Sequence, residues 1–511
     1  MLPSVYLIGA GPGDPELITL RGARCLRQAD VVLYDGLSNQ QLLALAPQAT
    51  GICVGKHGQS RIWTQEEIIA EMLQHVRAGR SVARLKGGDP AVFARTAEEV
   101  DALNEAGISY EIVPGITAAL AAGSYAGIPI THRKVASAVA LITGHEEPGK
   151  TQSALDWQAL ANFPGTLVVY MGVTTAKVWT DALISAGKDP LTPCALVRRC
   201  SHPDQETIHC TLEEIAACLT PASKFRPPVI TIIGPVTSLA DTMKWVDQRA
   251  LHGQRIMVTR PAEQADATCQ AIIALGGQPI RQPLIEVAPV DDPEDLDFAI
   301  DSLQSDAVIV FCSRNGVTAF FDRLFSLDLD ARSLHGNRIA AIGRKTAEQL
   351  EQYGIVADLV PDDFSSTGLC DLLEEQFADH QESLPPILSI RASRGTDTLQ
   401  QRLTAQGFEV QQLVAYQNRD VETIDASLHD MMRHHQIDWV TVTSSATANN
   451  LVRHFGDALN NTKLVAISAT TAKTLADLGY PAAAIAEDST VDTMIQAIVS
   501  APLNSLERAS S

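Results

Sequence analysis

The chain begins with an apolar run that leads into a glycine-rich loop, VYLIGAGPGDP (Val5–Pro15). An apolar run followed by closely spaced glycines is typical of the first strand and turn of an α/β fold. The loop departs from the dinucleotide fingerprint G-x-G-x-x-G, because Pro12 has no N–H to donate and Asp14 places a negative charge where phosphates would lie. We therefore expect a ligand that is not held through phosphate groups.

The first half of the chain continues this alternation of short apolar runs and amphipathic segments. One helix is predicted from Thr64-x-x-Glu67, a capping-box pattern, to Gly79, and another from Thr96-x-x-Glu99 to Gly107. A polar helical connector is expected at 237–253. Strands are expected at Val5–Ile8, Val31–Tyr34, Val82–Leu85, Tyr110–Val113, Ala138–Thr143, Leu167–Met171, Ala195–Val197 and Val229–Ile233. This alternation predicts an α/β architecture.

Three further small-residue loops follow predicted strands: KGGDP (Lys86–Pro90), PGIT (Pro114–Thr117) and YMGV (Tyr170–Val173). Ligands of open α/β sheets collect at the carboxyl ends of the strands, and glycines there let the backbone approach a ligand closely. We therefore expect these loops and the first one to form a single ligand-binding trough.

The second half contains an internal duplication. Residues 255–287, 306–321 and 340–361 resemble residues 387–417, 438–455 and 465–487, with offsets of 132, 132 and 125. The repeat predicts two similar α/β lobes with a ligand cleft between them. The alternative is a duplication that only builds scaffold.

The net charge of −21 is concentrated in the second half, where residues 246–511 carry 19 basic and 37 acidic side chains. Such an acidic half argues against nucleic-acid binding, which depends on neutralising phosphates. It leaves an anionic small substrate open, because local arginines decide that. No apolar run approaches the length of about 18 residues that a membrane span needs, so no membrane association is expected.

Nine cysteines are scattered along the chain without a C-x-x-C pair. Their nearest clustering, Cys194 to Cys218, lacks histidines at ligand spacing, so no metal site is predicted. The odd number of cysteines and the absence of an apolar leader before the first strand predict reduced thiols and a cytoplasmic location.

Several longer motifs occur in a fixed order over residues 1–245: GAGPGDPELITLRG, DVVLYDGLS, VGKHG, RLKGGDPAVFAR, VPGITAALAAGSYAGIPITHR and PGTLVVYMGV. In this order they resemble the uroporphyrinogen III C-methyltransferases of the tetrapyrrole methylase family. The resemblance implies two α/β subdomains, about 1–117 and 118–245. It also implies S-adenosylmethionine as cofactor, S-adenosylhomocysteine as its product, no metal, and a homodimer formed through this half.

The same resemblance assigns site residues. It implies acid–base roles for Asp35 and Lys56, and Arg133 is a candidate for pairing with substrate carboxylates. The resemblance implies that Asp35 faces the tetrapyrrole. The alternative, that Asp35 binds the ribose of a nicotinamide cofactor in an oxidoreductase, is rejected. The implied cofactor-binding residues are Pro12, Gly87, Gly88, Asp89, Val92, Thr117, Ala118, Met171 and Cys200.

The chain also departs from the family pattern. The family sequence FGRGGEE is FARTAEE here, with Ala94, Thr96 and Ala97, and Cys200 occupies the place of a glycine that contacts the cofactor through its backbone. These departures motivate a second hypothesis, in which the methylase half is catalytically impaired and binds the cofactor as a regulatory or scaffold domain.

Motifs of the second half include VTRPAEQADAT, VFCSRNGVTAFF, AIGRKTAEQLEQYGI, VPDDFSSTGL and LVAYQNR. Their order over residues 254–503 resembles the uroporphyrinogen III synthases. The resemblance implies one lobe of residues 254–287 plus 418–500, another of residues 288–413, and chain crossings near 286–292 and 414–420. It implies a catalytic Tyr416 at the hinge. Four hydroxyl residues lie at corresponding βα turns of the two repeats, and we expect them to hold substrate carboxylates: Ser313, Thr346, Ser445 and Thr470.

Together the two resemblances imply a bifunctional enzyme of tetrapyrrole biosynthesis. The second half would dehydrate and cyclise hydroxymethylbilane to uroporphyrinogen III with inversion of ring D. The first half would then transfer two methyl groups from S-adenosylmethionine to C2 and C7, which gives precorrin-2.

Overall fold

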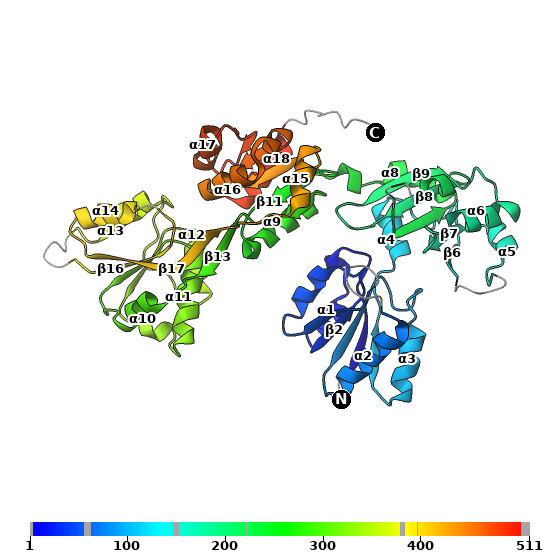
Figure 1. Ribbon diagram of the computed structural model, residues 1–511, viewed down its shortest axis with the longest axis horizontal. Helices are drawn as coiled ribbons and strands as arrows, with labels where there is room; N and C mark the ends of the chain where they lie inside the picture. Colours follow the sequence, from blue (N-terminus) through cyan, green and yellow to red (C-terminus); the bar gives the residue numbers. More distant parts are fainter. Residues whose placement is uncertain are drawn as a thin grey trace. The chain divides into compact units, whose positions relative to one another are not determined.

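The computed structural model describes residues 4–55, 63–146, 153–220, 223, 225–378, 384–395 and 397–501. The chain forms two compact units, Met1–Gly253 with Leu275–Gln278, and Gln254–Ala274 with Pro279–Ser511. Four five-stranded sheets, two in each half of the chain, carry the fold, and helices surround them (Figure 1).

The first sheet is entirely parallel, with strand order β3-β2-β4-β1-β5. Its strands are β1 (Val5–Gly9), β2 (Val31–Tyr34), β3 (Thr50–Cys53), β4 (Val82–Lys86) and β5 (Tyr110–Val113). Its helices are α1 (Leu20–Leu26), α2 (Gln65–Arg77), α3 (Thr96–Glu105) and α4 (Ala118–Tyr125).

The apolar run VYLI is continuous because both faces of β1 are covered. Val5 and Leu7 pack in a core with residues of α2 and α3, whereas Tyr6 and Ile8 pack in a second core with residues of α1. A parallel strand that is buried on both faces has no polar side to alternate with.

The second sheet, with order β6-β7-β10-β8-β9, is mixed: β6 and β7 are parallel and the other pairs are antiparallel. Its strands are β6 (Val139–Thr143), β7 (Thr166–Tyr170), β8 (Pro193–Arg198), β9 (Glu206–Thr211) and β10 (Val229–Ile233). The helices here are α5 (Trp157–Ala161), α6 (Ala176–Ser185), α7 (Ile215–Cys218) and α8 (Ala240–Met243).

The second half of the chain forms two lobes, each around one sheet. The first lobe has the order β12-β11-β18-β19-β20, from β11 (Arg255–Val258), β12 (Gln278–Arg281), β18 (Trp439–Val442), β19 (Lys463–Ala466) and β20 (Ala484–Ile485). Its helices are α9 (Ala262–Ala274), α15 (Ala426–Arg433), α16 (Ser445–Phe455), α17 (Ala469–Asp477) and α18 (Val491–Ser500).

The other lobe has the order β13-β17-β16-β14-β15, from β13 (Ile285–Pro289), β14 (Val308–Phe311), β15 (Arg338–Ala341), β16 (Ile387–Ala392) and β17 (Val410–Asp420). Its helices are α10 (Glu294–Asp301), α11 (Arg314–Ser326), α12 (Arg344–Glu351), α13 (Ser366–Gln376) and α14 (Thr398–Ala405). The antiparallel pair β13–β17, in which Pro289 lies opposite Tyr416, holds the two stretches where the chain passes between the lobes (Figure 1).

All eight strands predicted for the first half are present, but β3 and β9 were missed. The predicted capping box of α2 is formed by Thr64 and Glu67. The equivalent prediction for α3 is wrong in its cap: the helix begins at Thr96, yet its N-cap is Arg95, without a side-chain capping bond. Glu99 instead forms ion pairs with Arg84 and Lys86 of β4.

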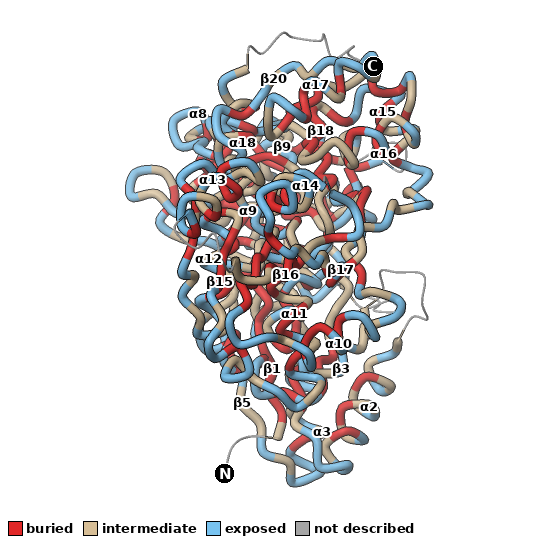
Figure 2. The backbone as a smooth tube through the Cα atoms, turned by 90° about the vertical axis from the view of Figure 1, so that its left-hand side faces the viewer, coloured by how far each residue is buried: buried red, intermediate tan, exposed pale blue. Residues whose placement is uncertain are grey.

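Buried residues follow the central strands, and exposed residues lie mostly on the outer helices and loops (Figure 2). None of the helices described is long and apolar enough to cross a membrane. Within the same residues, no group of three or more His, Cys, Asp or Glu side chains is arranged to hold a metal ion.

Candidate active sites

Three glycine-bearing loops of the first sheet pack backbone against backbone. A Cβ atom on Gly9 would lie 2.5 Å from the Cα of Gly115 and 2.7 Å from the carbonyl oxygen of Gly88. Gly88 and Gly11 exchange two backbone hydrogen bonds, of 2.8 and 3.2 Å. The neighbouring backbone leaves no room for a side chain at Gly9 or Gly115, so the three loops form one packed structure.

These loops form a wall of a cavity of about 780 Å³ in the first unit. Residues that follow β7 and β8, Met171 and Cys200, line it from the second sheet. Asp35 lines the same cavity. So does each residue that the sequence predicted to bind the cofactor: Pro12, Gly87, Gly88, Asp89, Val92, Thr117, Ala118, Met171 and Cys200.

The carboxylate of Asp89 joins two of the loops. One of its oxygens accepts the N–H of Ala91 at 2.7 Å, and the other accepts the N–H of Gly115 at 2.9 Å. The sequence predicts Asp89 only as a cofactor-binding residue, without these two backbone contacts. Each oxygen keeps acceptor capacity for a ligand, but the contacts in the structure make Asp89 a brace between KGGDP and PGIT.

Tyr170 is a residue of this site that the sequence analysis missed, although it opens the motif YMGV. Its hydroxyl forms a 2.6 Å hydrogen bond with the Thr117 hydroxyl and accepts the N–H of Ala119 at 2.9 Å. Its ring packs against Phe93, with 5.0 Å between ring centroids. Burial raises the pKa of Tyr170, so the phenol stays protonated while it holds the first turn of α4.

Three non-glycine residues that line the cavity have left-handed backbone conformations: Phe93, Met171 and Arg199, with φ of +51°, +53° and +49°. Such conformations are strained for residues with a Cβ and gather at ligand-binding sites. The side chain of Met171 is 49% exposed, so it offers apolar surface to a ligand.

Cys200 fits where the family pattern has a glycine. The left-handed residues are its neighbours Arg199 and Ser201, whereas Cys200 itself lies outside that region and tolerates a Cβ. The side chain is buried, and its sulfur lies 3.9 Å from the carbonyl oxygen of Ala118. Burial raises the pKa of the thiol to about 12, so it behaves as a small neutral side chain.

Asp35 is held by a buried network of charges. Arg84 donates from Nη2 to Asp35 at 2.5 Å and from Nε to Glu99 at 3.1 Å. Lys86 donates to the second oxygen of Glu99 at 2.5 Å. Gln65 donates to Glu99 at 3.2 Å. Arg84, Lys86 and Glu99 are buried, and Asp35 alone reaches the cavity.

Burial acts differently on the two cations of this network. It opposes the charge of Arg84, but the carboxylates of Asp35 and Glu99 outweigh it and raise the pKa of Arg84. For Lys86, burial is the largest influence and lowers the pKa, with Arg84 adding to the effect and Glu99 opposing it. The network therefore keeps a permanent positive charge against Asp35.

His202 closes the cavity beside the first loop. A Cβ on Gly13 would lie 2.3 Å from its Nε2, which explains why this position is a glycine. Burial and the nearby Arg199 lower the pKa of His202 to about 4, so the imidazole is neutral at physiological pH.

Two further site residues were predicted for the methylase half. Lys56 falls outside the described residues. Arg133 is exposed and is not among the residues that line the cavity.

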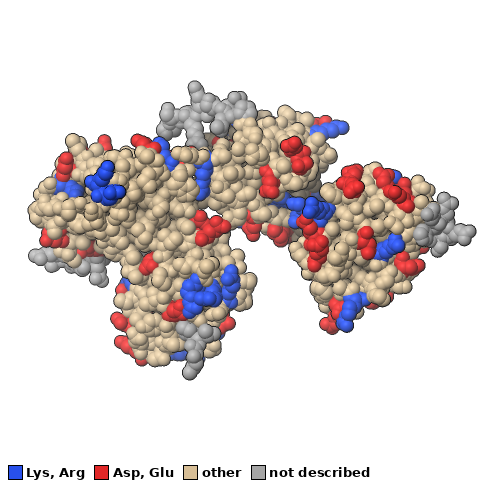
Figure 3. Space-filling view, turned by 180° about the vertical axis from the view of Figure 1, so that it is seen from behind, with Lys and Arg blue, Asp and Glu red and all other residues tan. Residues whose placement is uncertain are grey.

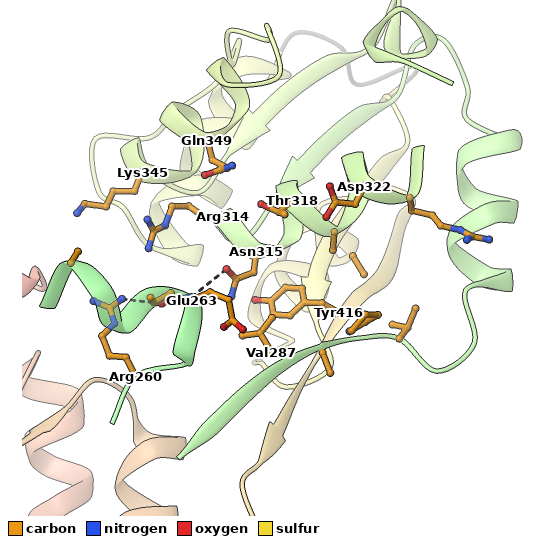
Figure 4. A pocket seen from close by; sticks show the side chains of 18 of the residues that line it. Arg260, Glu263, Val287, Arg314, Asn315, Thr318, Asp322, Lys345, Gln349 and Tyr416 are labelled. Atoms are coloured by element: carbon orange, nitrogen blue, oxygen red, sulfur yellow. Dashed lines mark hydrogen bonds between the residues drawn. The ribbon is translucent and has the colours of Figure 1, made fainter. Parts of the chain in front are cut away.

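The second unit contains a cavity of about 1040 Å³ lined by residues of both lobes. Tyr416 of β17 lies in its lining, and Figure 4 shows its ring facing the cavity. The tyrosine hydroxyl is 3.0 Å from the hydroxyl of Ser313, which also caps α11 by accepting the N–H of Gly316. Burial raises the pKa of Tyr416, so the hydroxyl is available as a proton donor.

None of the substrate-binding residues predicted for this half, Ser313, Thr346, Ser445 and Thr470, is among the residues that line this cavity, although Ser313 contacts the lining through Tyr416. Thr346 is buried in the first turn of α12. Ser445 begins α16 and its hydroxyl bonds Thr474 at 2.8 Å, and Thr470 lies in α17. The side chains that cap these two helices are Ser444 and Ser468, one or two residues earlier.

Three of the cations that line this cavity, Arg260, Arg314 and Lys345, were not predicted as site residues from the sequence. They lie in the motifs VTRPAEQADAT, VFCSRNGVTAFF and AIGRKTAEQLEQYGI, so a signal was present in each.

Comparison with known proteins assigns a family to each half. The family of tetrapyrrole (corrin/porphyrin) methylases matches residues 4–216, and the family of uroporphyrinogen-III synthase HemD matches residues 266–496. The porphyrin biosynthesis protein HemD of Ruminiclostridium josui is 34% identical over 502 residues, which are 97% of this chain and 97% of that protein.

Two further relatives match the first half. The S-adenosyl-L-methionine-dependent uroporphyrinogen III methyltransferase of Methanosarcina barkeri is 45% identical over 240 residues, 47% of this chain and 94% of that protein. The crystal structure of uroporphyrin-III C-methyl transferase from Thermus thermophilus complexed with S-adenyl homocysteine is 43% identical. It covers 46% of this chain and 99% of its own, with a TM-score of 0.40. The chain therefore belongs to the family of porphyrin biosynthesis proteins that join a tetrapyrrole methylase to a uroporphyrinogen III synthase.

Proposed function

We propose that the chain carries out two successive steps of tetrapyrrole biosynthesis. The second half dehydrates and cyclises hydroxymethylbilane to uroporphyrinogen III with inversion of ring D. The first half transfers two methyl groups from S-adenosylmethionine to C2 and C7 of that ring and produces precorrin-2. The observation that carries the proposal is the occurrence, in one family member, of a glycine-walled cavity in one unit and an arginine-lined cleft in the other.

The first cavity suits S-adenosylmethionine by its chemistry. This cofactor supplies a methyl group that its sulfonium already activates, so the protein must chiefly align the reactants and accept a proton. The packed loops offer backbone groups, and Met171 offers apolar surface. Arg199, the arginine that lines the cavity, is engaged by Asp204 at 2.7 Å and is not free to bind a phosphate.

Asp35 is the acid–base residue in this proposal. Its carboxylate lines the cavity while Arg84 holds it from behind, which fixes its position. Lys56 is retained as the second acid–base residue on the strength of the family pattern. The loops pack together in a chain that carries Ala94, Thr96, Ala97 and Cys200 in place of the family residues, and this supports a working methylase.

Tyr416 is the acid of the synthase half. Its protonated hydroxyl, oriented by Ser313, would assist the departure of the bilane hydroxyl group, and the lobes would fold the linear substrate for ring closure.

We also propose that the protein is a homodimer formed through the methylase half. The edge strand β5 and the neighbouring helices expose Leu20, Ile112 and Leu120, which are 91%, 44% and 52% exposed. Exposed apolar side chains favour association with a second copy, and an edge strand offers it unpaired backbone groups. Sedimentation analysis would detect the dimer.

A cytoplasmic location suits the nine free thiols and is testable by cell fractionation.

Crossed variants test the assignment of the two activities. With hydroxymethylbilane as substrate, Asp35→Asn should give unmethylated uroporphyrinogen III while retaining S-adenosylhomocysteine binding. Tyr416→Phe should slow ring closure, yet methylation should proceed when uroporphyrinogen III is supplied. If Asp35→Asn instead abolished cofactor binding, Asp35 would be a cofactor anchor and our assignment would be wrong.

A further inference from the structure

Most arginines of the second half are neutralised by carboxylates. On the face drawn in Figure 3, basic and acidic side chains are interspersed in small groups. The pairs include Arg281–Asp266, Arg323–Asp297, Arg391–Asp397, Arg394–Asp420, Arg402–Glu374, Arg419–Asp291 and Arg453–Glu422. In the part of the chain that the structure describes, Arg260, Arg314 and Lys345 form no ion pair, and all three line the synthase cleft. Three cations without a carboxylate partner among the described residues thus lie in the same cleft of an acidic unit.

These cations come from opposite sides of the cleft. Arg260 follows β11 in one lobe, whereas Arg314 begins α11 and Lys345 lies in the first turn of α12 in the other. Figure 4 shows the three side chains extending toward the same opening. Gln264 links the two sides: it accepts from Arg260 Nη2 at 3.0 Å and donates to Asn315 at 3.3 Å.

The cations are also placed where an anion would stabilise them. The Nε of Arg260 is buried and lacks a hydrogen-bond partner among the described residues. Arg314 and Lys345 occupy the first turns of helices, where the helix dipole disfavours positive charge and favours an anion. Burial and the charge of Arg314 lower the pKa of Arg260, because the two guanidinium groups repel one another.

We propose that Arg260 and Arg314 form a carboxylate clamp: one carboxylate side chain of the linear tetrapyrrole binds both guanidinium groups and draws the lobes together, with Lys345 binding a neighbouring carboxylate. The clamp rests on the proposed synthase function and names the groups that recognise its substrate. Guanidinium groups bind carboxylates through paired, charge-assisted hydrogen bonds. The acidic residues that also line the cleft, Glu263, Asp322 and Asp492, repel carboxylates and so restrict how the substrate can lie.

Steady-state kinetics of the full chain test the clamp, with S-adenosylmethionine omitted so that only ring closure is measured. Arg260→Gln and Arg314→Gln should each raise the KM for hydroxymethylbilane about tenfold or more, because each removes a charged hydrogen bond. Added salt should raise the KM of the wild type more than that of either variant. Arg323→Gln is the matched control. Arg323 lines the same cleft, but Asp297 holds it in a forked pair at 2.5 Å, so its loss should change KM little.

The double variant tests whether one carboxylate binds both arginines. If it does, Arg260→Gln with Arg314→Gln should raise KM by less than the product of the single effects, whereas either change combined with Lys345→Gln should be nearly multiplicative. Arg260→Lys should restore part of the affinity, and circular dichroism should show unchanged folding. The clamp is excluded if the wild type makes uroporphyrinogen III but Arg260→Gln and Arg314→Gln affect KM no more than Arg323→Gln. A wild type that makes only the type I isomer would refute the synthase function itself.

Discussion

The buried charges behind Asp35 predict that a single substitution, Glu99→Gln, lowers the free energy of unfolding by a large amount that depends on pH. Glu99 is fully buried and accepts hydrogen bonds from Lys86, Arg84 and Gln65. Glutamine keeps the shape but leaves two buried cations with one carboxylate between them. Removing one partner of a buried ion pair costs about 3–5 kcal/mol. This is a large share of the roughly 5–15 kcal/mol by which a domain is stable.

The pH dependence follows from Lys86. Its pKa is already lowered in the folded protein, chiefly by burial. Between the folded and unfolded pKa values the unfolded chain binds more protons, so stability rises with pH. Without Glu99 the folded pKa of Lys86 falls further, and the lysine becomes neutral at a lower pH. The difference in unfolding free energy between the wild type and Glu99→Gln should therefore become smaller as the pH rises from 7 toward the ordinary lysine pKa of 10.5.

Hydrogen exchange in graded urea, followed on peptides of β4 and α3, measures this deficit locally, because a chain of two units does not unfold in one step. The control is Glu98→Gln, the neighbouring residue, whose exposed pair with Arg95 contributes at most about 1 kcal/mol. Equal losses of unfolding free energy in Glu99→Gln and Glu98→Gln would refute the reasoning. A loss in Glu99→Gln that does not change with pH would also refute it.

Three further predictions concern the methylase cavity. Gly9→Ala should abolish S-adenosylhomocysteine binding in calorimetry, because its Cβ would overlap the backbone of Gly115 at 2.5 Å; retained affinity would contradict the packed-loop account. Tyr170→Phe should lower the free energy of unfolding by about 1–2 kcal/mol and weaken cofactor binding, since the N–H of Ala119 loses its acceptor. The pKa of His202 is lowered from 6.5 to about 4, so the wild type should lose stability as the pH falls through that window. Chemical denaturation at pH 6.5 and 4.5 should show that His202→Gln loses less unfolding free energy than the wild type over this pH range. An equal loss in the two proteins would refute this.

The sequence predicted the central methylase strands well because they are apolar on both faces, as VYLI in β1 shows. The two strands it missed, β3 and β9, lie at sheet edges and carry mixed polar sequences, TGIC and ETIHCT. An edge strand needs fewer apolar side chains, so its hydrophobic signal is weak.

Glu99 shows a different limit. The pattern Thr96-x-x-Glu99 is that of a capping box, and nothing local distinguishes it from the box that forms at Thr64. Its role is decided by Arg84 and Lys86 on β4, two buried cations that need a carboxylate. Such pairing between a strand and a helix becomes visible only when the fold is known.

The two halves differ in how well their sites could be predicted. The methylase residues lie in long motifs whose spacing fixes each position, and all that were predicted to bind cofactor line one cavity. In the synthase half the repeat predicted the turns, but register errors of one or two residues separate Ser445 and Thr470 from the capping serines. The cleft cations Arg260, Arg314 and Lys345 lie within quoted motifs, but only the fold shows that they share one cleft.

The central claim, that one chain both closes the ring and methylates it, is tested most directly by a single incubation. The full-length protein is given hydroxymethylbilane and S-adenosylmethionine with a trideuterated methyl group, and the ring product is analysed by mass spectrometry. The account predicts a type III ring that carries two labelled methyl groups. An unlabelled type III ring would mean that the methylase half does not catalyse, and a type I ring alone would contradict the synthase assignment.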